Sequence, residues 1–464
     1  MIEVKTRSKI KLNDINIGFN KGSTKGGTDL QVSALGRIPM IVIKGVVISE
    51  ENLITLKLNN ETFTPTISAS FRDNTNKLND SLFPLDNEIM SIFIKSTSEM
   101  IMPIRMDFKI LKFAPKKLKS GKDSDIIIDV EGSLNVDELY YSDFVSYKGT
   151  SYDVLQQISS FCGLGFATNI TKTNDSMTWI NPNHKMSKFI QDITLYSYKD
   201  DSSFLWSYID FYYNLVYVDI ETSLTEKDSV NNALPYNVVS NTKKETTTPL
   251  FLSNHPDLQS SNQYINKYSI ENASTDVNLR IGYKTRVRFY DKTDKNMNTT
   301  LLDTISSVGV GDQIVMKDTP NASSTFSKNV VGGTYIGKLD RDNVHPNYLY
   351  AYKQNSKNLD FLQKVKMTVT LRGAMNFVLY RFQKVLVKIY DLQDPTKMKE
   401  ETSSNTNDVK SSAQLDESKI NHRLSGEWLI TAINYTYSRE YGNVQELTLV
   451  KRELTSVYSV PVKK

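Results

Sequence analysis

A chain of 464 residues is longer than one compact core usually requires, so its length predicts roughly two to four domains. A hydrophobic share of 39% with 56 basic and 52 acidic residues is typical of a globular protein and excludes a disordered or fibrous one. Lys and Arg are spread along the chain among Asp and Glu, which disfavours strong nucleic-acid binding. The single cysteine, Cys162, excludes an intrachain disulfide and a cysteine-based zinc site.

The first 37 residues are predicted to form a flexible polar arm. Met1–Leu12 lacks the apolar core of a signal peptide, so we expect synthesis in the cytoplasm. Residues 13–37 are too rich in Gly, Ser, Lys and Asn to offset the entropy of ordering. The longest apolar runs, such as Ile38–Ile43, are too short to span a bilayer, and no stable membrane association is expected.

Residues 38–135 have the pattern of an antiparallel β domain. Ile67, Ala69 and Phe71 alternate with polar residues, as in a strand with one buried face. Turn-forming residues separate this strand from its neighbours. The expected strands are 38–48, 53–58, 67–71, 88–95, 105–113 and 125–131.

Residues 136–225 are predicted to form a mixed helix and strand domain. Ser151 is expected to cap a helix that carries Val154, Leu155, Ile158 and Phe161 on one face and stops at Gly163. A second helix is expected after Asp200–Asp201, with Phe204, Leu205, Tyr208, Ile209 and Tyr212 on one stripe, followed by a strand at 216–220. We interpret these aromatic residues as core.

A polar linker or long loop is predicted at 226–262, and a third mixed domain, with a strand at 280–290, at 263–345. The last domain, 346–464, repeats the pattern of the first. Its expected strands are 364–371, 384–390, 427–437 and 444–452, with a mobile loop at 398–419. The prediction is therefore an α+β, mostly β chain with two similar antiparallel, barrel-like β domains and mixed domains inserted between them.

Six apolar residues on the expected strands are candidate positions for the core of these β domains or for subunit contacts. They are Phe71, Phe93, Val369, Val387, Trp428 and Leu449. Tyrosines are dense at 140–141, 212–213, 348–352 and 435–437. Tyr offers a large contact area with few rotatable bonds, so we favour a subunit interface over a sugar-binding groove for them.

No catalytic, cofactor-binding or metal site is expected. The four histidines are isolated from one another and from Cys162, which does not fit a zinc site. Val308–Asp312 lacks the Gly-Lys-Ser/Thr ending of a phosphate loop. Asp200 and Asp201, placed before an expected helix, are interpreted as capping residues rather than as an acid and base pair.

Several segments in order resemble one family, the central baseplate hub proteins of contractile-tailed phages. This family is related to the N-terminal half of the type VI secretion spike protein VgrG. The segments are Gly149–Ile158 running into Gly163–Phe166, then Asp201–Ile209 with Val218–Asp219, and finally Leu424–Ile430 with Leu447–Arg452. Each motif is built of common residues, and their order along 60–455 carries the resemblance.

The resemblance implies a non-enzymatic structural protein of the virion, located in the tail baseplate. Three chains would form a homotrimeric ring joining the sixfold tail tube to a trimeric cell-puncturing spike, with a channel for genome ejection. Implied partners are the spike, tail tube or tube-initiator proteins and other baseplate proteins, with transient passage of DNA or tape-measure protein. No cofactor is implied. The alternatives are a tail-associated peptidoglycan hydrolase and a receptor-binding or glycan-binding tail protein.

Overall fold

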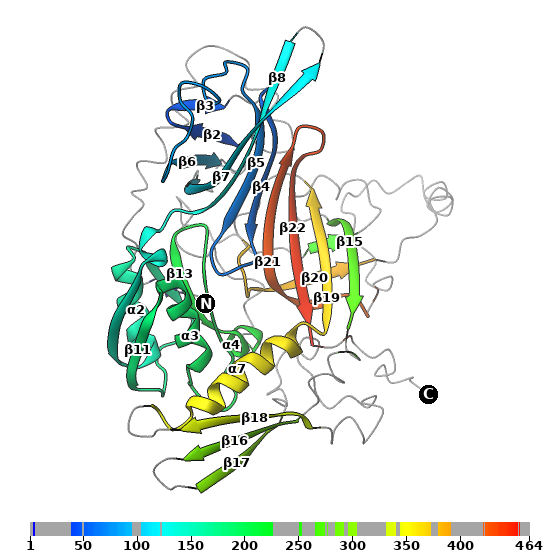
Figure 1. Cartoon of the computed structure of the whole chain (residues 1–464). Coiled ribbons are helices and arrows are strands. Elements are labelled where there is room, and N and C mark those ends of the chain that lie inside the picture. Colours follow the sequence, from blue (N-terminus) through cyan, green and yellow to red (C-terminus); the bar gives the residue numbers. More distant parts are fainter. Residues whose placement is uncertain are drawn as a thin grey trace, which may run out of the picture.

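The computed structural model is an α+β fold with most of its ordered chain in strands, which confirms the predicted fold class. It describes residues 3–4, 39–48, 51–94, 104–120, 123–225, 250–252, 265–273, 276, 284–291, 296–303, 331–339, 344–372, 379–390, 421, 423–452 and 454. Figure 1 shows one long curved sheet, with a mixed domain beside it and helix α7 (Tyr348–Leu362) along its lower end.

The long sheet has 13 strands drawn from both ends of the chain. Its strand order is β15-β19-β22-β21-β4-β5-β8-β7-β6-β2-β3, with β20 pairing β21 and β14 pairing β20. All pairs are antiparallel except β14 with β20. The bounds are β2 Met40–Ile43, β3 Val46–Ile48, β4 Leu53–Asn60, β5 Thr66–Arg72, β6 Ile89–Ile94, β7 Ile104–Ser120, β8 Asp123–Leu134, β14 Leu250–Leu252, β15 Ile265–Asn272, β19 Val365–Arg372, β20 Lys384–Ile389, β21 Gly426–Ser438 and β22 Gly442–Lys451.

The strands expected in 38–135 and 346–464 are all present, and the two-residue alternation is clear in strands such as β4 and β5. In β5, Ile67, Ala69 and Phe71 are buried and their neighbours are not. Two left-handed residues, Lys44 and Gly45, connect β2 to β3 in a two-residue hairpin. Strand β7 runs further than expected, to Ser120, and pairs with β8 along this extension.

The mixed domain packs two helices against a small sheet of order β1-β10-β13-β12. An antiparallel pair formed by β9 and β11, which are separated in sequence by α2 and β10, lies beside it. The bounds are β1 Glu3–Val4, the 3-10 helix η2 Asp137–Tyr140, β9 Ser142–Gly149, α2 Ser151–Phe161, β10 Gly165–Thr168, β11 Met177–Lys185, α3 Met186–Tyr196, β12 Leu205–Ile209, β13 Asn214–Asp219 and α4 Ile220–Thr225.

The helix expected at 151 is confirmed as α2, with two corrections: its start differs, and Phe161, expected on its packed face, is 56% exposed. Its N-cap is Thr150, not Ser151: the Thr150 side chain accepts from the backbone of Asp153, and the Asp153 side chain accepts from the backbone of Thr150. Gly163, at φ +63°, ends the helix, and Cys162 before it is buried.

The helix expected after Asp200–Asp201 is wrong, because Leu205–Ile209 is strand β12. Four of its five residues are buried, so its apolar residues form a near-continuous run that fits a helical stripe as well as a fully covered strand. Asp200 lies in a turn and accepts from the amide and hydroxyl of Ser202 instead of capping a helix. Helix α3, which packs on β12, was not predicted.

The third region contains a three-stranded sheet of order β17-β16-β18, formed by Asn296–Asp303, Lys284–Asp291 and Val331–Leu339. Helix α7 follows and docks on the mixed domain through two amide side chains. Asn355 accepts from the Leu205 amide and donates to main-chain carbonyls at the end of α3. Gln354 donates to the carbonyl of Ser203 at 2.7 Å.

Several predictions fall outside the described residues. These are the arm apart from β1, the linker at 226–262 apart from β14, and the loop at 398–419. The short strands β1 and β14 themselves were not predicted. Among the residues that the structure describes, no helix has both the length and the apolar character needed to cross a membrane.

Candidate assembly interface

The long sheet contains the same six-strand arrangement twice. In the first block, β2 and β4 to β8 lie in the order β4-β5-β8-β7-β6-β2. In the second block, β14, β15 and β19 to β22 lie in the order β15-β19-β22-β21-β20-β14. The strands therefore correspond one to one in chain order and in sheet position, and only the direction of the outermost strand, β2 or β14, differs.

Two pairs of equivalent β-bulges fix the correspondence to single residues. The β4–β5 ladder shifts between Leu53 and Thr55, and the β15–β19 ladder shifts between Ile265 and Lys267. The β7–β8 ladder shifts between Ile110 and Lys112, and the β21–β22 ladder between Ile430 and Ala432. Aligning the first bulge pair makes Phe71 equivalent to Leu371, because these residues face Leu53 and Ile265. Aligning the second makes Ile110 equivalent to Ile430, and their partners Gly132 and Leu449 equivalent to each other.

A third ladder tests this alignment independently. Ile67 pairs with Gly132 across β5 and β8. The first pair of bulges makes Met367 the equivalent of Ile67, and the second pair makes Leu449 the equivalent of Gly132. Met367 does pair with Leu449 across β19 and β22. The ladders therefore agree without a slip, although Gly and Leu occupy the same position. The regions around Phe71 and Val369, expected to be built alike, have the same topology and register.

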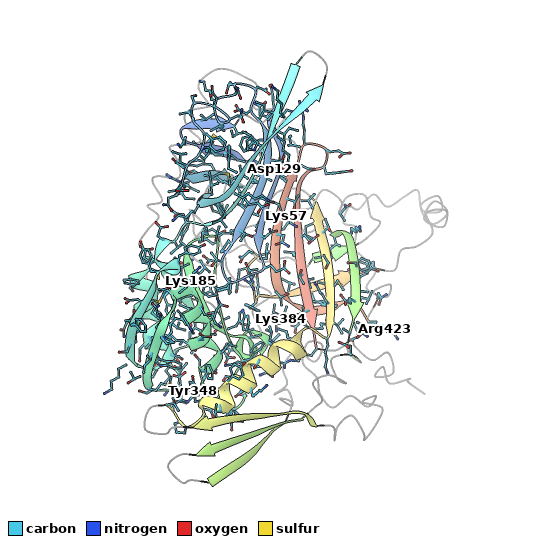
Figure 2. All side chains as sticks on the ribbon, viewed as in Figure 1. Lys57, Asp129, Lys185, Tyr348, Lys384 and Arg423 are labelled. Atoms are coloured by element: carbon cyan, nitrogen blue, oxygen red, sulfur yellow. The ribbon has the colours of Figure 1, made fainter. Side chains whose placement is uncertain are left out.

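The two blocks meet in a seam between β4 and the second half of β21. The first half of β21, Gly426–Leu429, pairs with β20, and its second half, Ile433–Ser438, pairs with β4 from Thr55 to Asn60. Leu56 and Leu58 face Tyr437 and Tyr435 across the seam, and all four side chains are buried. Figure 2 labels Lys57 on β4 at this seam. The seam continues the core from one block into the next.

Arg381 reinforces the seam at one end. Its Nε donates to the carbonyl of Thr431, the bulged residue of β21, and its Nη1 donates to the carbonyl of Thr62, just after β4, both at 2.8 Å. Its guanidinium carbon lies 4.5 Å from the ring centroid of Tyr208 in the mixed domain. Burial lowers the pKa of Arg381 to about 10, so the side chain is still charged at neutral pH. One cation thus ties both blocks to the mixed domain.

The six candidate positions are all buried within the chain. Their exposed fractions are 8% for Phe93 and 0% for Phe71, Val369, Val387, Trp428 and Leu449. Trp428 and Phe108 occupy equivalent places in β21 and β7, and Val387 and Ile92 in β20 and β6. The role of these residues at a subunit contact stays a prediction.

The tyrosine clusters divide between the inside and the surface of the chain. Tyr435 and Tyr437 are buried at the seam. Tyr348 stacks on Tyr196 with ring centroids 4.0 Å apart, which joins α7 to α3. Of the first cluster, Tyr141 is 56% exposed. Many of these rings therefore pack within one chain, which the sequence spacing could not distinguish from an interface.

Of the residues considered for chemistry, Asp200, Asp201 and His345 have partners of their own within the chain. Asp201 accepts from the Tyr198 hydroxyl at 2.7 Å, and Asp200 lies in the turn described above. His345 is buried, with its Nε2 2.9 Å from the Tyr196 carbonyl. Among the described residues, no three His, Cys, Asp or Glu side chains group as ligands of a metal ion.

One buried lysine lies against a candidate position. The Nζ of Lys451 is 4.4 Å from the centroid of the Trp428 ring and donates to the Ser425 carbonyl at 3.1 Å. Burial lowers the pKa of Lys451 to about 7, and the nearby Glu427 opposes this shift. Lys451 was not singled out in the sequence, because it stands in an ordinary alternating strand.

This burial predicts a pH-dependent stability. In the unfolded chain the pKa of Lys451 returns to about 10.4, so the unfolded state binds more protons between pH 7 and about 10.4. The free energy of unfolding therefore rises as pH increases through this window. The added stability disappears as pH falls towards 7. Melting temperatures from pH 6.5 to 9.5 should rise more steeply for the wild type than for Lys451→Met. Lys366→Met, at an exposed site on β19, should parallel the wild type. Parallel curves for all three proteins would contradict the assignment.

No protein-family model matches the chain, and no curated protein matches it. Solved structures do resemble it. A tail protein from Neisseria meningitidis superposes with a TM-score of 0.47 and 11% identity, over 89% of this chain and 96% of that one. The prophage MuSo2 43 kDa tail protein from Shewanella oneidensis gives a TM-score of 0.47 and 11% identity, over 89% and 98%.

A component of the E. coli type VI secretion system gives a TM-score of 0.41 and 9% identity, over 89% of this chain and 78% of that chain. These are the classes of protein named by the resemblance in the sequence. All of these TM-scores are below 0.5.

Proposed function

We propose that this protein is a structural hub of a phage tail baseplate, a ring of three chains that joins the sixfold tail tube to a threefold spike. The observation that carries the proposal is the repeated six-strand block, with two copies per chain in one continuous sheet. Three such chains present six like blocks to a sixfold neighbour, while the complete ring keeps threefold symmetry for a trimeric spike.

The seam within each chain supports this role. Its strand pairing and buried side chains hold the two blocks at a fixed angle, as an adaptor between two symmetries requires. The order of the hub-like segments along the sequence supports the same function. The proposal includes the other implied partners, which are the spike, tube or tube-initiator proteins and other baseplate proteins. It also includes a lumen for DNA or tape-measure protein and a location in the virion.

The proposed action is mechanical and needs no bond chemistry. A strongly basic chain would not suit a lumen through which DNA slides, because dense phosphate contacts would retain the DNA. The formal net charge of +4 over 464 residues supports such passage.

The number of chains in solution tests the proposal. Native mass spectrometry and light scattering coupled to chromatography should find a species of three times the chain mass of 52.8 kDa. Dilution should dissociate this species directly to single chains. Each chain of a closed ring is held by two contacts, whereas a dimer has only one and should not accumulate. A chain that stays monomeric at every concentration, or that forms dimers as its largest species, would contradict the hub.

A further inference from the structure

Strand β15 holds the same place in the second block as the seam strand β4 holds in the first. On one side β15 pairs with β19 as β4 pairs with β5, with the bulge at the equivalent residue. On its other side β4 meets β21, whereas β15 has no hydrogen-bonded partner there among the described strands and only approaches β14. Tyr268 and Ile270 occupy the positions of Leu56 and Leu58. The two leucines are 0% exposed, but Ile270 is 38% exposed.

Strand β7 is equally incomplete at the place where β21 receives β4. Its first part, Ile104–Lys109, pairs with β6, as Gly426–Leu429 of β21 pairs with β20. Beyond the bulge, β7 pairs with β8 on one side and with no described strand on the other. The alignment of Ile110 with Ile430 makes Phe113–Leu118 equivalent to Ile433–Ser438, the half of β21 that forms the seam. Figure 1 shows the β7–β8 hairpin extending past the rest of the sheet.

We propose that β15 of one copy of this chain pairs antiparallel with the outer edge of β7 in a second copy, repeating between chains the seam that β4 and β21 form within one. The inference rests on the proposed function, because it names the joint that closes the ring. Transferring the register of the inner seam gives six opposite pairs, each written with the β7 residue first and the β15 residue of the neighbouring chain second: Phe113 with Asn272, Ala114 with Glu271, Pro115 with Ile270, Lys116 with Ser269, Lys117 with Tyr268, and Leu118 with Lys267.

The side chains suit this register. Ile270 faces Pro115 on the face that is apolar in the inner seam, and its exposed surface becomes covered. On the other face Glu271 lies diagonally across from Lys116, close enough for these two oppositely charged side chains to form an ion pair. Pro115 has no N–H, so it removes at most one donor from the ladder, and proline is tolerated at the edge of a sheet.

The joint also accounts for ring closure. In this joint β15 is the donor edge and the second half of β7 is the acceptor edge, both of them unpaired among the described strands, so the contact runs head to tail. Head-to-tail contacts close into a ring when the rotation between subunits divides a full turn. Since the inner seam and the proposed joint are the same contact, each chain advances the ring by two equal steps. Pairing the two edges also removes surfaces on which other strands could assemble.

A cysteine pair tests the joint directly. Ala114→Cys combined with Glu271→Cys places two thiols directly opposite each other on neighbouring chains, at the Cβ separation that allows a disulfide. The native Cys162 is buried, so the introduced thiols are the reactive ones. After mild oxidation, denaturing electrophoresis without reductant should show covalent dimers and trimers, and reductant should return them to single chains. Each single variant should stay monomeric on the same gel.

Two matched variants control for register and for strand geometry. Ala114→Cys with Ser269→Cys shifts the pair by two residues. Its yield of linked chains should be at least about five-fold lower than that of the Ala114 and Glu271 pair. Asn59→Cys with Asn434→Cys is the equivalent pair in the inner seam and should form a disulfide within one chain, seen as the loss of two free thiols.

The outcomes separate the joint from the ring. Trimers in solution without linked chains, while the Asn59 and Asn434 pair oxidises, would overturn the joint and leave the proposed hub intact. Equal linking by the in-register and shifted pairs would overturn the register. A protein that is monomeric in solution and forms no linked chains would overturn both proposals.

Discussion

Replacing Arg381 with methionine is expected to lower the free energy of unfolding by about 2–4 kcal/mol. The substitution removes the two charge-assisted bonds to the carbonyls of Thr431 and Thr62 and the contact with the Tyr208 ring. Methionine avoids the cost of burying a charge, but it leaves two carbonyl groups inside the protein without these donors, and that loss dominates. Urea denaturation followed by tryptophan fluorescence measures the change.

The control is Arg439→Met, at an exposed arginine just beyond β21. Surface substitutions of this kind usually change stability by less than about 0.5 kcal/mol. Similar losses for both variants would contradict a special role of Arg381 at the seam. A sharper readout is hydrogen exchange: Arg381→Met should increase exchange in β4 and in the second half of β21 more than in β5 or β8.

Replacing Asp219 with alanine should destabilise the mixed domain by about 3–5 kcal/mol. Its carboxylate is buried and receives four hydrogen bonds, from Lys199 Nζ at 2.6 Å, from the Thr222 hydroxyl, and from the amides of Phe204 and Glu221. It therefore caps helix α4, fixes the backbone at Phe204 just before β12, and balances the charge of Lys199. Thermal unfolding followed by circular dichroism measures the loss as a lower melting temperature.

Asp200→Ala is the matched variant, since Asp200 is the second carboxylate near the same lysine. Its oxygen lies 3.7 Å from Lys199 Nζ, and its side chain is 45% exposed. An exposed pair of this kind contributes about 1 kcal/mol or less. If Asp200→Ala lowered the melting temperature as much as Asp219→Ala, the Asp219 carboxylate would not be the group that matters.

Much of the β structure could be predicted from the sequence. The alternation in β5 and β19 marks strands with one covered face, and turn residues such as Lys44–Gly45 mark their ends. Helix α2 was predictable because its apolar residues repeat at helical spacing and Gly163 stops it. These are local signals, read within about ten residues. The prediction failed at β12, where burial on both faces hides the period.

The candidate interface was only partly visible in the sequence. Two like blocks could be inferred from two runs of strands, but equivalent positions carry residues as different as Gly132 and Leu449, so residue identity does not reveal the register. The bulges that define the register are single extra residues with no distinctive type, namely Ile54, Leu111, Asn266 and Thr431. Arg381 lies in a turn, and nothing near it in the sequence marks its partners.

The sequence by itself determined the fold class, most strand positions and the presence of two similar blocks, because period and turn chemistry act locally. Only the tertiary structure decided that β4 joins β21, that Arg381 spans this seam, and that β15 and the second half of β7 each keep one unpaired edge among the described strands. The physical reason is that backbone pairing between strands hundreds of residues apart depends on which edges the folded core brings together, and every strand offers the same N–H and C=O groups.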